Sequence, residues 1–510
     1  MKKYKIRNVL VVASVASMLM GGQACTDLDA EVFDQAETSL FPANEDELLS
    51  TVGATYGDLR GFLDPVLVLN EATTDELVVP TRGPDWYDNA SWQQMAKHEW
   101  SPVSPGQING SWEWAYRVIA GANTNIIGLE NSTLELDGKE TIVSEVHMLR
   151  AFAYFWLLDM FGNVAIVTED TPAGNAPQSS RQELYDFIES EILAAIPNLK
   201  EEVNVTTYSR FTKGAAYTLL AKLYLNAEVY TGTPQWQKAL DATNQVINSP
   251  AGYELNPNYL TNFAINNGNN PDAYKENIFA IPYDKILAGG MNMQMRTLHY
   301  AQGSVFGLAG NPWNGFATRA EFYNTFSDND KRKAMWLEGP QLNNNGEVIT
   351  FVDAVDGQSK DLVFTPKITS LDKAFGNEGV RNVKYEVQRG NTRNDQDNDL
   401  VVFRYADVLL MKAEALLRLG MPAEAILLVN EVRDRAGTGP IVNLTLDALL
   451  EERGREFAWE GWRRNDMIRF GKYTGSTWEF KTKTDPTRKL FPIPSLQISN
   501  NPNLKQNPGY

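Results

Sequence analysis

The sequence predicts a predominantly α-helical fold in which tetratricopeptide-like helix pairs form a scaffold, interrupted by a loop-rich irregular insertion with short β-strands. Apolar residues recur every three or four positions over 399–420, which is the spacing of a buried helix face, and a second helical segment follows over 421–437. Gly420 and Pro422 predict a tight connection between these two helices. Over 251–398 this periodicity disappears, and asparagine and glycine become frequent.

The N-terminus has the features of a signal peptide, residues 1–24. A basic start precedes the apolar run 9–20, which is too short to span a bilayer. The only cysteine, Cys25, follows directly, and we expect it to be the lipidated first residue of the mature chain. The alternative is ordinary cleavage near Ala24 that leaves a free thiol. Gly22 stands where such lipidation signals usually have leucine.

Charge and composition narrow the class of ligand. The chain has 510 residues, 43% of them hydrophobic, and a formal charge of −18. Loss of residues 1–24 removes four basic residues and no acid, so the charge becomes −22. Such a surface repels nucleic acid and anionic lipid and favours neutral ligands. With one cysteine, no disulfide can form within the chain.

Helical patterns continue along the N-terminal half. The segment 140–161 is apolar nearly all round and should be buried on most sides. The motif Ala-x₄-Asn-x-aliphatic begins at Ala120, Ala239 and Ala425, which favours a repeat layer. Ser180, with glutamate three places on, predicts a helix start. The predicted helices before the insertion are 45–61, 112–130, 140–161, 180–197, 210–230 and 234–248.

The loop-rich segment 251–398 contains short β-like runs. Long irregular insertions in a helical protein usually carry function. Residues 62–110 have the same irregular, aromatic-rich character. The predicted strands are 278–281, 350–352, 362–364 and 383–387.

Four ordered motifs resemble the SusD/RagB family, the surface glycan-binding lipoproteins of bacterial polysaccharide-utilisation systems. They are Arg404-Tyr-Ala-Asp-Val-Leu-Leu-Met-x-Ala-Glu414, Asn430-x-Val-Arg-x-Arg-Ala-Gly437, Arg455-Glu-Phe-x-x-Glu-Gly-x-Arg-x-x-Asp-x-x-Arg469 and the tail Pro492 to Tyr510. The resemblance runs from the leader to the last residue. It implies five parts: signal peptide 1–24, lipidated linker 25–43, N-terminal helical region 44–250 with binding loop 62–110, ligand-binding region 251–398, and C-terminal region 399–510.

The charged residues of the third motif are expected to pair with one another. Glu451 with Arg455, and Glu460 with Arg464, stand four apart on a predicted helix. We therefore interpret this segment as a structural ion-pair lattice, not as catalytic carboxylates with basic partners. Its tryptophans, at positions 459 and 462, are expected in the core.

Aromatic residues in two loop stretches are the candidate ligand-binding residues. Sugars present flat C–H patches edged by hydroxyls, so a glycan site needs aromatic faces beside side chains that form directed hydrogen bonds. The stretches 81–92 and 291–313 have this mixture. The alternative for each ring is packing beneath its own loop. The candidates are Trp86, Tyr87, Trp92, Tyr300 and Trp313.

Motifs for catalysis are missing. The three histidines lack metalloprotease spacing, and there is no Gly-x-Ser-x-Gly, P-loop or cysteine nucleophile. A carboxylate-pair glycosidase remains open because its two acids need no linear motif. Calcium at 328–330 or 395–399 is an alternative to solvated acidic turns, but the EF-hand spacing is absent. We expect no catalytic residue, no metal and no cofactor.

The leading hypothesis is non-catalytic, cell-surface binding of a neutral polysaccharide or oligosaccharide. The resemblance implies delivery to a SusC-like TonB-dependent outer-membrane transporter, with the protein held on the outer membrane by lipid on Cys25. It also implies that acidic residues 27, 29 and 31 resemble a surface-export signal, for which a solvated linker is the alternative. The rival hypotheses are a secreted glycoside hydrolase or lyase, and a protein-binding repeat scaffold without glycan affinity. No nucleic-acid partner is expected.

Overall fold

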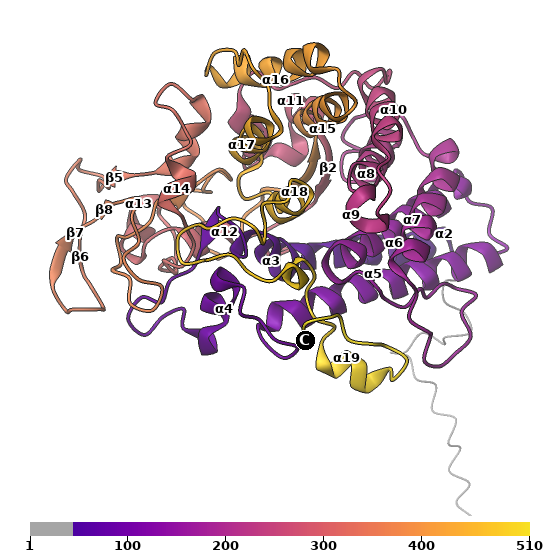
Figure 1. Ribbon diagram of the computed structural model, residues 1–510, viewed down its shortest axis with the longest axis horizontal. Helices are drawn as coiled ribbons and strands as arrows, with labels where there is room; N and C mark the ends of the chain where they lie inside the picture. The colour runs from indigo at the N-terminus through magenta and orange to yellow at the C-terminus, as the bar shows by residue number, and fades with distance from the viewer. Residues whose placement is uncertain (1–43) are drawn as a thin grey trace, which may run out of the picture. The chain divides into compact units, whose positions relative to one another are not determined.

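Helices dominate the part of the chain that the computed structural model describes, residues 44–510 (Figure 1). The predicted signal peptide and Cys25 lie outside the described residues. None of the described helices combines the length and apolar composition needed to cross a bilayer. The predicted α class is confirmed. The longer helices are α2 (Glu45–Asp58), α5 (Gly106–Asn131), α6 (Lys139–Phe161), α7 (Arg181–Ala195), α8 (Lys213–Leu225), α10 (Trp236–Ile247), α15 (Tyr405–Arg418), α16 (Pro422–Ala436) and α17 (Leu446–Phe457).

Helix α6 is the centre of the N-terminal half and is buried along nearly its whole length. It packs against α5 and α7. Phe152 of α6 lies against Trp114 of α5 and against Phe403, with the ring planes at 90° in both pairs. Such edge contacts between large buried rings stabilise a core by more than their buried area alone. The expectation that this helix is buried on most sides is confirmed.

The helix pairs α8–α10 and α15–α16 form the repeat layer, and α10 packs on α15, so the two pairs stack. Ala239 and Ala425 are fully buried, as close helix approach requires. The third copy of the repeat motif, on α5, is different. There Ala120 is exposed and Ile127 is 45% exposed, so this copy does not pack as the other two do.

One prediction about the start of the C-terminal region was wrong. Val402 was expected on a helix face, but it lies in β10 (Leu400–Arg404), which pairs antiparallel with β2 (Asn277–Ile281). The run Leu-Val-Val-Phe is rich in β-branched residues, which favour a strand buried on both faces. Helix α15 therefore begins at Tyr405.

The insertion contains paired short strands as predicted, except at 383–387. Strand pairing ends at Asn382, whose side chain accepts the Lys384 N–H at 2.9 Å and turns the chain. The remaining pairs are β1 (Leu77–Val78) with β3 (Ala317–Thr318), β4 (Trp336–Leu337) with β9 (Arg381–Asn382), β5 (Gly339–Pro340) with β8 (Val363–Phe364), and β6 (Thr350–Val352) with β7 (Ser359–Asp361).

A left-handed turn separates α17 from α18 (Arg463–Arg469) within the third family motif. Trp459 and Gly461 have φ angles of 61° and 85°. Two buried carboxylates hold this turn: Glu76 accepts the Trp459 N–H at 3.1 Å, and Glu71 accepts the Gly461 N–H at 2.5 Å. Both tryptophans of the motif are buried, which confirms their expected place in the core.

Because of this turn, the predicted ion pair between Glu460 and Arg464 does not form. Glu460 instead accepts hydrogen bonds from Arg404 and Lys384, and Arg464 pairs with Asp159 of α6 at 2.6 Å. The predicted pair of Glu451 with Arg455 does form, at 3.8 Å on the helix surface.

The central feature of the C-terminal region is a buried ionic network between the insertion and the last repeat. Arg404, at the end of β10, contacts Glu276 at 2.6 Å, Glu456 at 2.9 Å and Glu460 at 2.8 Å. All four side chains are almost completely buried. The other members are Asp330, Arg332, Lys384, Arg435 and Glu452. The charged family motif is therefore structural, as predicted, although its pairs are mostly buried.

The cations of this network keep its carboxylates ionised. Burial opposes the charge of Glu456, but Arg435, Arg404 and Arg332 outweigh it and hold the pKa of this carboxyl well below its usual range. In the same way Arg332 and Arg455 lower the pKa of Glu452 to about 2 against the effect of burial.

We predict that Glu456→Gln destabilises the fold by about 3–5 kcal/mol, because the substitution leaves the three arginines around it buried and short of a partner charge. Denaturant unfolding at pH 7 measures the change. Lys472→Ala is the matched control, since the Lys472–Asp447 pair lies at the surface with side chains 37% and 69% exposed. We expect it to change stability by less than ~1 kcal/mol. Equal effects of the two substitutions would contradict the assigned role of the network.

Candidate functional site

The loop before α4 (Ser91–Lys97) presents aromatic side chains on a strained backbone. Trp86, Asp88, Asn89 and Ala90 all have positive φ angles, between 39° and 64°. A left-handed conformation costs a residue with a side chain about 1 kcal/mol or more. Strain of this kind concentrates at ligand sites, where the surrounding structure holds the backbone in place.

Trp86 is held by a hydrogen bond from its indole nitrogen and by two neighbouring rings. Its indole N–H donates to the Trp313 carbonyl at 2.7 Å. Trp92 and Phe316 pack against it with ring centroids 5.5 and 5.7 Å away. A Cβ atom on Gly315 would come within 2.2 Å of the Trp86 ring, so only glycine permits this packing. The indole remains partly exposed.

The two predicted loop stretches meet through Tyr300. Its hydroxyl donates to the Asp85 carboxylate at 2.6 Å. Burial, and then the hydrogen bond to Asp85, raises the pKa of Tyr300 above its usual range, so the phenol stays protonated. Figure 1 shows the segment leading into α4 beside that around α12 (Met293–Thr297) and α13 (Gly303–Phe306).

The five candidate aromatics therefore lie in one region but differ in exposure. Tyr87 is 56% exposed, while Trp86, Tyr300 and Trp313 are partly buried. Trp92 is only 5% exposed, and its indole N–H donates to Asp88 at 2.6 Å. This burial does not support a stacking role for Trp92. The ring instead supports Trp86 and the strained loop.

A cavity of about 380 Å³ adjoins Tyr300 and contains residues that the sequence analysis missed. Asn311 and Thr350 supply polar groups, and Phe351 supplies a partly exposed ring. Phe351 lies on β6, and its run 350–352 was predicted only as a strand. Nothing in that short run indicates that a hairpin places its ring beside His299, with centroids 4.4 Å apart.

His299 lines this cavity and carries one ring nitrogen that has no hydrogen-bond partner among residues 44–510. Burial lowers the pKa of the ring to about 3, so it is neutral. Its Nδ1 accepts the Ala301 N–H at 3.1 Å, which leaves the hydrogen on Nε2. This nitrogen is shielded from solvent, so it is a buried donor without a partner and not a group that the cavity presents to a ligand.

The chemistry of the region suits binding more than bond cleavage. Asp85 and Asp88 accept hydrogen bonds from Tyr300 and Trp92, which gives both carboxylates a positioning role. Across the described residues there is no group of three or more His, Cys, Asp or Glu side chains arranged to hold a metal ion. Partly exposed rings next to amides and hydroxyls are what an uncharged polyol needs.

Comparison with known proteins assigns the family. The model of the SusD family matches residues 229–510, more than half of the chain. The chain belongs to the SusD family. A second family model, described as "Starch-binding associating with outer membrane", matches residues 68–225. The predicted resemblance is confirmed.

Individual relatives agree with this assignment. The chain is 29% identical to the starch-binding protein SusD of Bacteroides thetaiotaomicron, over 88% of this chain and 86% of that protein. Among solved structures, a laminarin-binding SusD-like protein superposes with a TM-score of 0.74 at 23% identity, covering 92% of this chain and all of the other. Surface glycan-binding protein A of B. thetaiotaomicron, in complex with laminarihexaose, gives 0.73 at 24% identity, covering 91% and 99%.

The second family model and these relatives are named for binding and not for a reaction. This confirms the prediction that the protein is not an enzyme. The solved structures share less than 25% of their residues with this chain, so they support the fold and not the identity of a ligand.

We predict that acid weakens the fold partly through His299. Burial lowers the pKa of His299 from 6.5 in the unfolded chain to about 3 in the folded one. Between these two pH values only the unfolded state binds the proton, so the free energy of unfolding decreases as the pH falls. Between pH 8 and pH 5 the wild type should lose about 2 kcal/mol more unfolding free energy than His299→Gln. Denaturant titrations at the two pH values give this difference, and equal losses in the two proteins would contradict it.

Proposed function

We propose that this protein binds a neutral polysaccharide or oligosaccharide at the cell surface without cleaving it. The observation that carries the proposal is the strained loop that holds Trp86 and Tyr87 beside Tyr300 and Trp313. Aromatic faces stack on the C–H patches of sugars, and the hydrogen-bonding groups of the adjoining cavity suit sugar hydroxyls. Relatives named for starch and laminarin support the same class of ligand.

The geometry implies modest affinity for one short oligosaccharide. Each stacked ring contributes on the order of 1 kcal/mol, so two or three rings give dissociation constants nearer millimolar than nanomolar. A long polymer that meets many copies of the protein on one cell would bind more tightly through avidity.

The delivery step belongs to the same proposal. The protein would pass its glycan to a SusC-like TonB-dependent transporter in the outer membrane, and lipid on Cys25 would hold it at the cell surface. The family model described as associating with the outer membrane supports this location. The stacked helix pairs offer a rigid surface for such a partner.

Isothermal titration against a panel of neutral polysaccharides tests the binding site. We predict that Trp86→Ala and Trp313→Ala each weaken binding of the preferred glycan by about fivefold to tenfold, because each removes one stacking surface. Gly315→Ala should weaken it similarly without removing an aromatic ring, because the added methyl group displaces the Trp86 indole. Trp236→Ala is the matched control, since it removes a partly exposed tryptophan from α10 in the repeat layer.

The control should bind as the wild type does. A correctly folded wild type that binds nothing in the panel, or loop variants that all bind unchanged, would overturn the proposed site.

The anchor is tested separately. We predict that Cys25→Ala releases the protein from the outer-membrane fraction into the soluble fraction, because no acyl chain can then be attached. Cell fractionation followed by immunoblotting measures the distribution. A variant that stays with the membrane through washing in high salt would argue against lipidation at this residue.

A further inference from the structure

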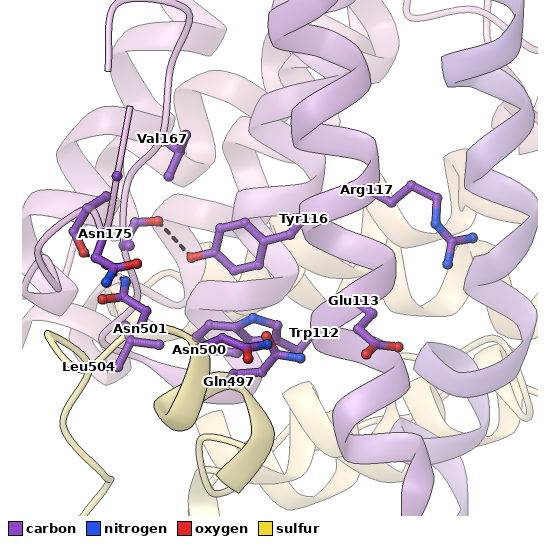
Figure 2. A pocket seen from close by; sticks show the side chains of 13 residues that line it. Trp112, Glu113, Tyr116, Arg117, Val167, Asn175, Gln497, Asn500, Asn501 and Leu504 are labelled. Carbon is purple, nitrogen blue, oxygen red and sulfur yellow. Dashed lines mark hydrogen bonds between the residues drawn. The ribbon is translucent and has the colours of Figure 1, made fainter. Parts of the chain in front are cut away.

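A second cavity, of about 520 Å³, lies on a different part of the molecule (Figure 2). Helix α5 forms one wall, the loop after α6 forms another, and α19 (Ser495–Asn500) with the following tail forms the third. Its volume is within the range of small-molecule sites in proteins. None of the aromatic candidates of the first site lines it. We call it the tail-side pocket.

The tail-side pocket combines aromatic rings with side-chain amides. Tyr116 presents a partly exposed ring, and Trp112 lies beneath it, 4% exposed, with ring centroids 5.0 Å apart. In Figure 2 Tyr116 lies between Asn175 and Asn501 on one side and the charged side chains of α5 on the other. The lining amides are Asn175, Gln497, Asn500 and Asn501. Each amide both donates and accepts hydrogen bonds, as a sugar hydroxyl does.

Hydrogen bonds across the walls hold the tail-side pocket open without a ligand. The Tyr116 hydroxyl donates to the Ala165 carbonyl at 2.7 Å. The Asn501 amide donates to the Ala176 carbonyl at 2.9 Å, and the Asn503 amide donates to the Asn175 carbonyl at 2.7 Å. A cavity built in advance costs a ligand little ordering entropy.

Some of these amides have hydrogen-bonding capacity left for a ligand. The side chains of Asn175 and Asn500 are exposed and have no hydrogen bond to other described residues. Gln497 donates to Asn109 at 2.9 Å and keeps its carbonyl oxygen. The usable groups therefore lie on two of the three walls.

The charges of the lining exclude several other classes of ligand. Glu113 and Arg117, both exposed on α5, carry opposite charges, so the lining has no net charge. A phosphate-bearing ligand would find a single cation, and a purely apolar one would leave the amides without partners. A neutral polyol with one apolar face fits both constraints.

We propose that the tail-side pocket is a second carbohydrate-binding site that takes one or two neutral pyranose units. The ring of Tyr116 supplies the stacking surface, and Asn175, Gln497 and Asn500 bond the hydroxyls. The inference rests on the proposed function only for the class of ligand. A polymer with repeating units would engage the two sites together, and its avidity would exceed the affinity of either one.

Saturation-transfer NMR on the mature chain tests the tail-side pocket, with maltohexaose and laminarihexaose as probes. The double variant Trp86→Ala/Trp313→Ala, which disables the first site, is the background. We expect it to keep weak binding of one probe. Adding Tyr116→Ala, or separately Asn175→Ala with Asn500→Ala, should weaken this residual binding at least about fivefold. The asparagine pair is exposed, so its removal leaves the fold intact and covers the case in which Tyr116→Ala does not fold.

The outcomes separate the two proposals. Residual binding that the pocket substitutions reduce supports the second site. A background without residual binding, while the wild type binds, overturns the second site and leaves the first standing. Residual binding that neither set of pocket substitutions weakens also overturns the second site. Binding that depends on Tyr116 but not on Trp86 or Trp313 supports the second site and rejects the first.

Discussion

The fold depends on ionic contacts that are buried where the loop-rich insertion meets the last repeat. Removing charges from water is costly, and the cost is offset only when each charge finds good partners. Arg404 meets this condition with three glutamates, one of which comes from the insertion and two from the family motif. If one charged side chain is lost, its former partners stay buried without that partner. The contacts therefore stabilise the fold only as a complete set. The insertion is therefore a fixed part of the fold.

Because the insertion is fixed in place, the aromatic loops can keep a strained backbone conformation. Trp86 and three of the four residues that follow it adopt left-handed backbone angles. Such a loop persists only if its surroundings determine it fully. Here Gly315 admits the indole, and the Trp313 carbonyl and Asp85 tie the first loop to the second. A rigid platform loses little entropy when it binds, which matters when each ring contributes only on the order of 1 kcal/mol.

The sequence predicted the helices well because their signals are local. The apolar spacing of α6, the capping box at Ser180 and the glycine stop at Gly420 all depend on near neighbours. The errors involve contacts that are distant in the chain. Val402 lies in a strand because β2 is available to pair with it, and Glu460 turns to Arg404 because a left-handed turn ends α17.

Prediction of the site also succeeded where the signal is local and failed where it depends on distant contacts. Composition was enough to find the two loops, since a mixture of aromatic and amide residues is visible in the sequence. It could not separate the buried Trp92 from the exposed Tyr87, because exposure depends on what packs above each ring. It also missed the place of Phe351 beside His299, because a distant hairpin brings the two rings together.

The hydrogen bonds that Glu76 and Glu71 accept from the turn at Trp459 and Gly461 also determine when the chain can finish folding. These partners are 390 and 383 positions apart. While the polypeptide is being made, the two glutamates lack these backbone partners until nearly the whole chain has emerged from the ribosome. Contacts between such distant positions slow folding and lengthen the time during which apolar surface is exposed to aggregation. We therefore expect the newly made protein to expose apolar surface until the residues around Gly461 have been made.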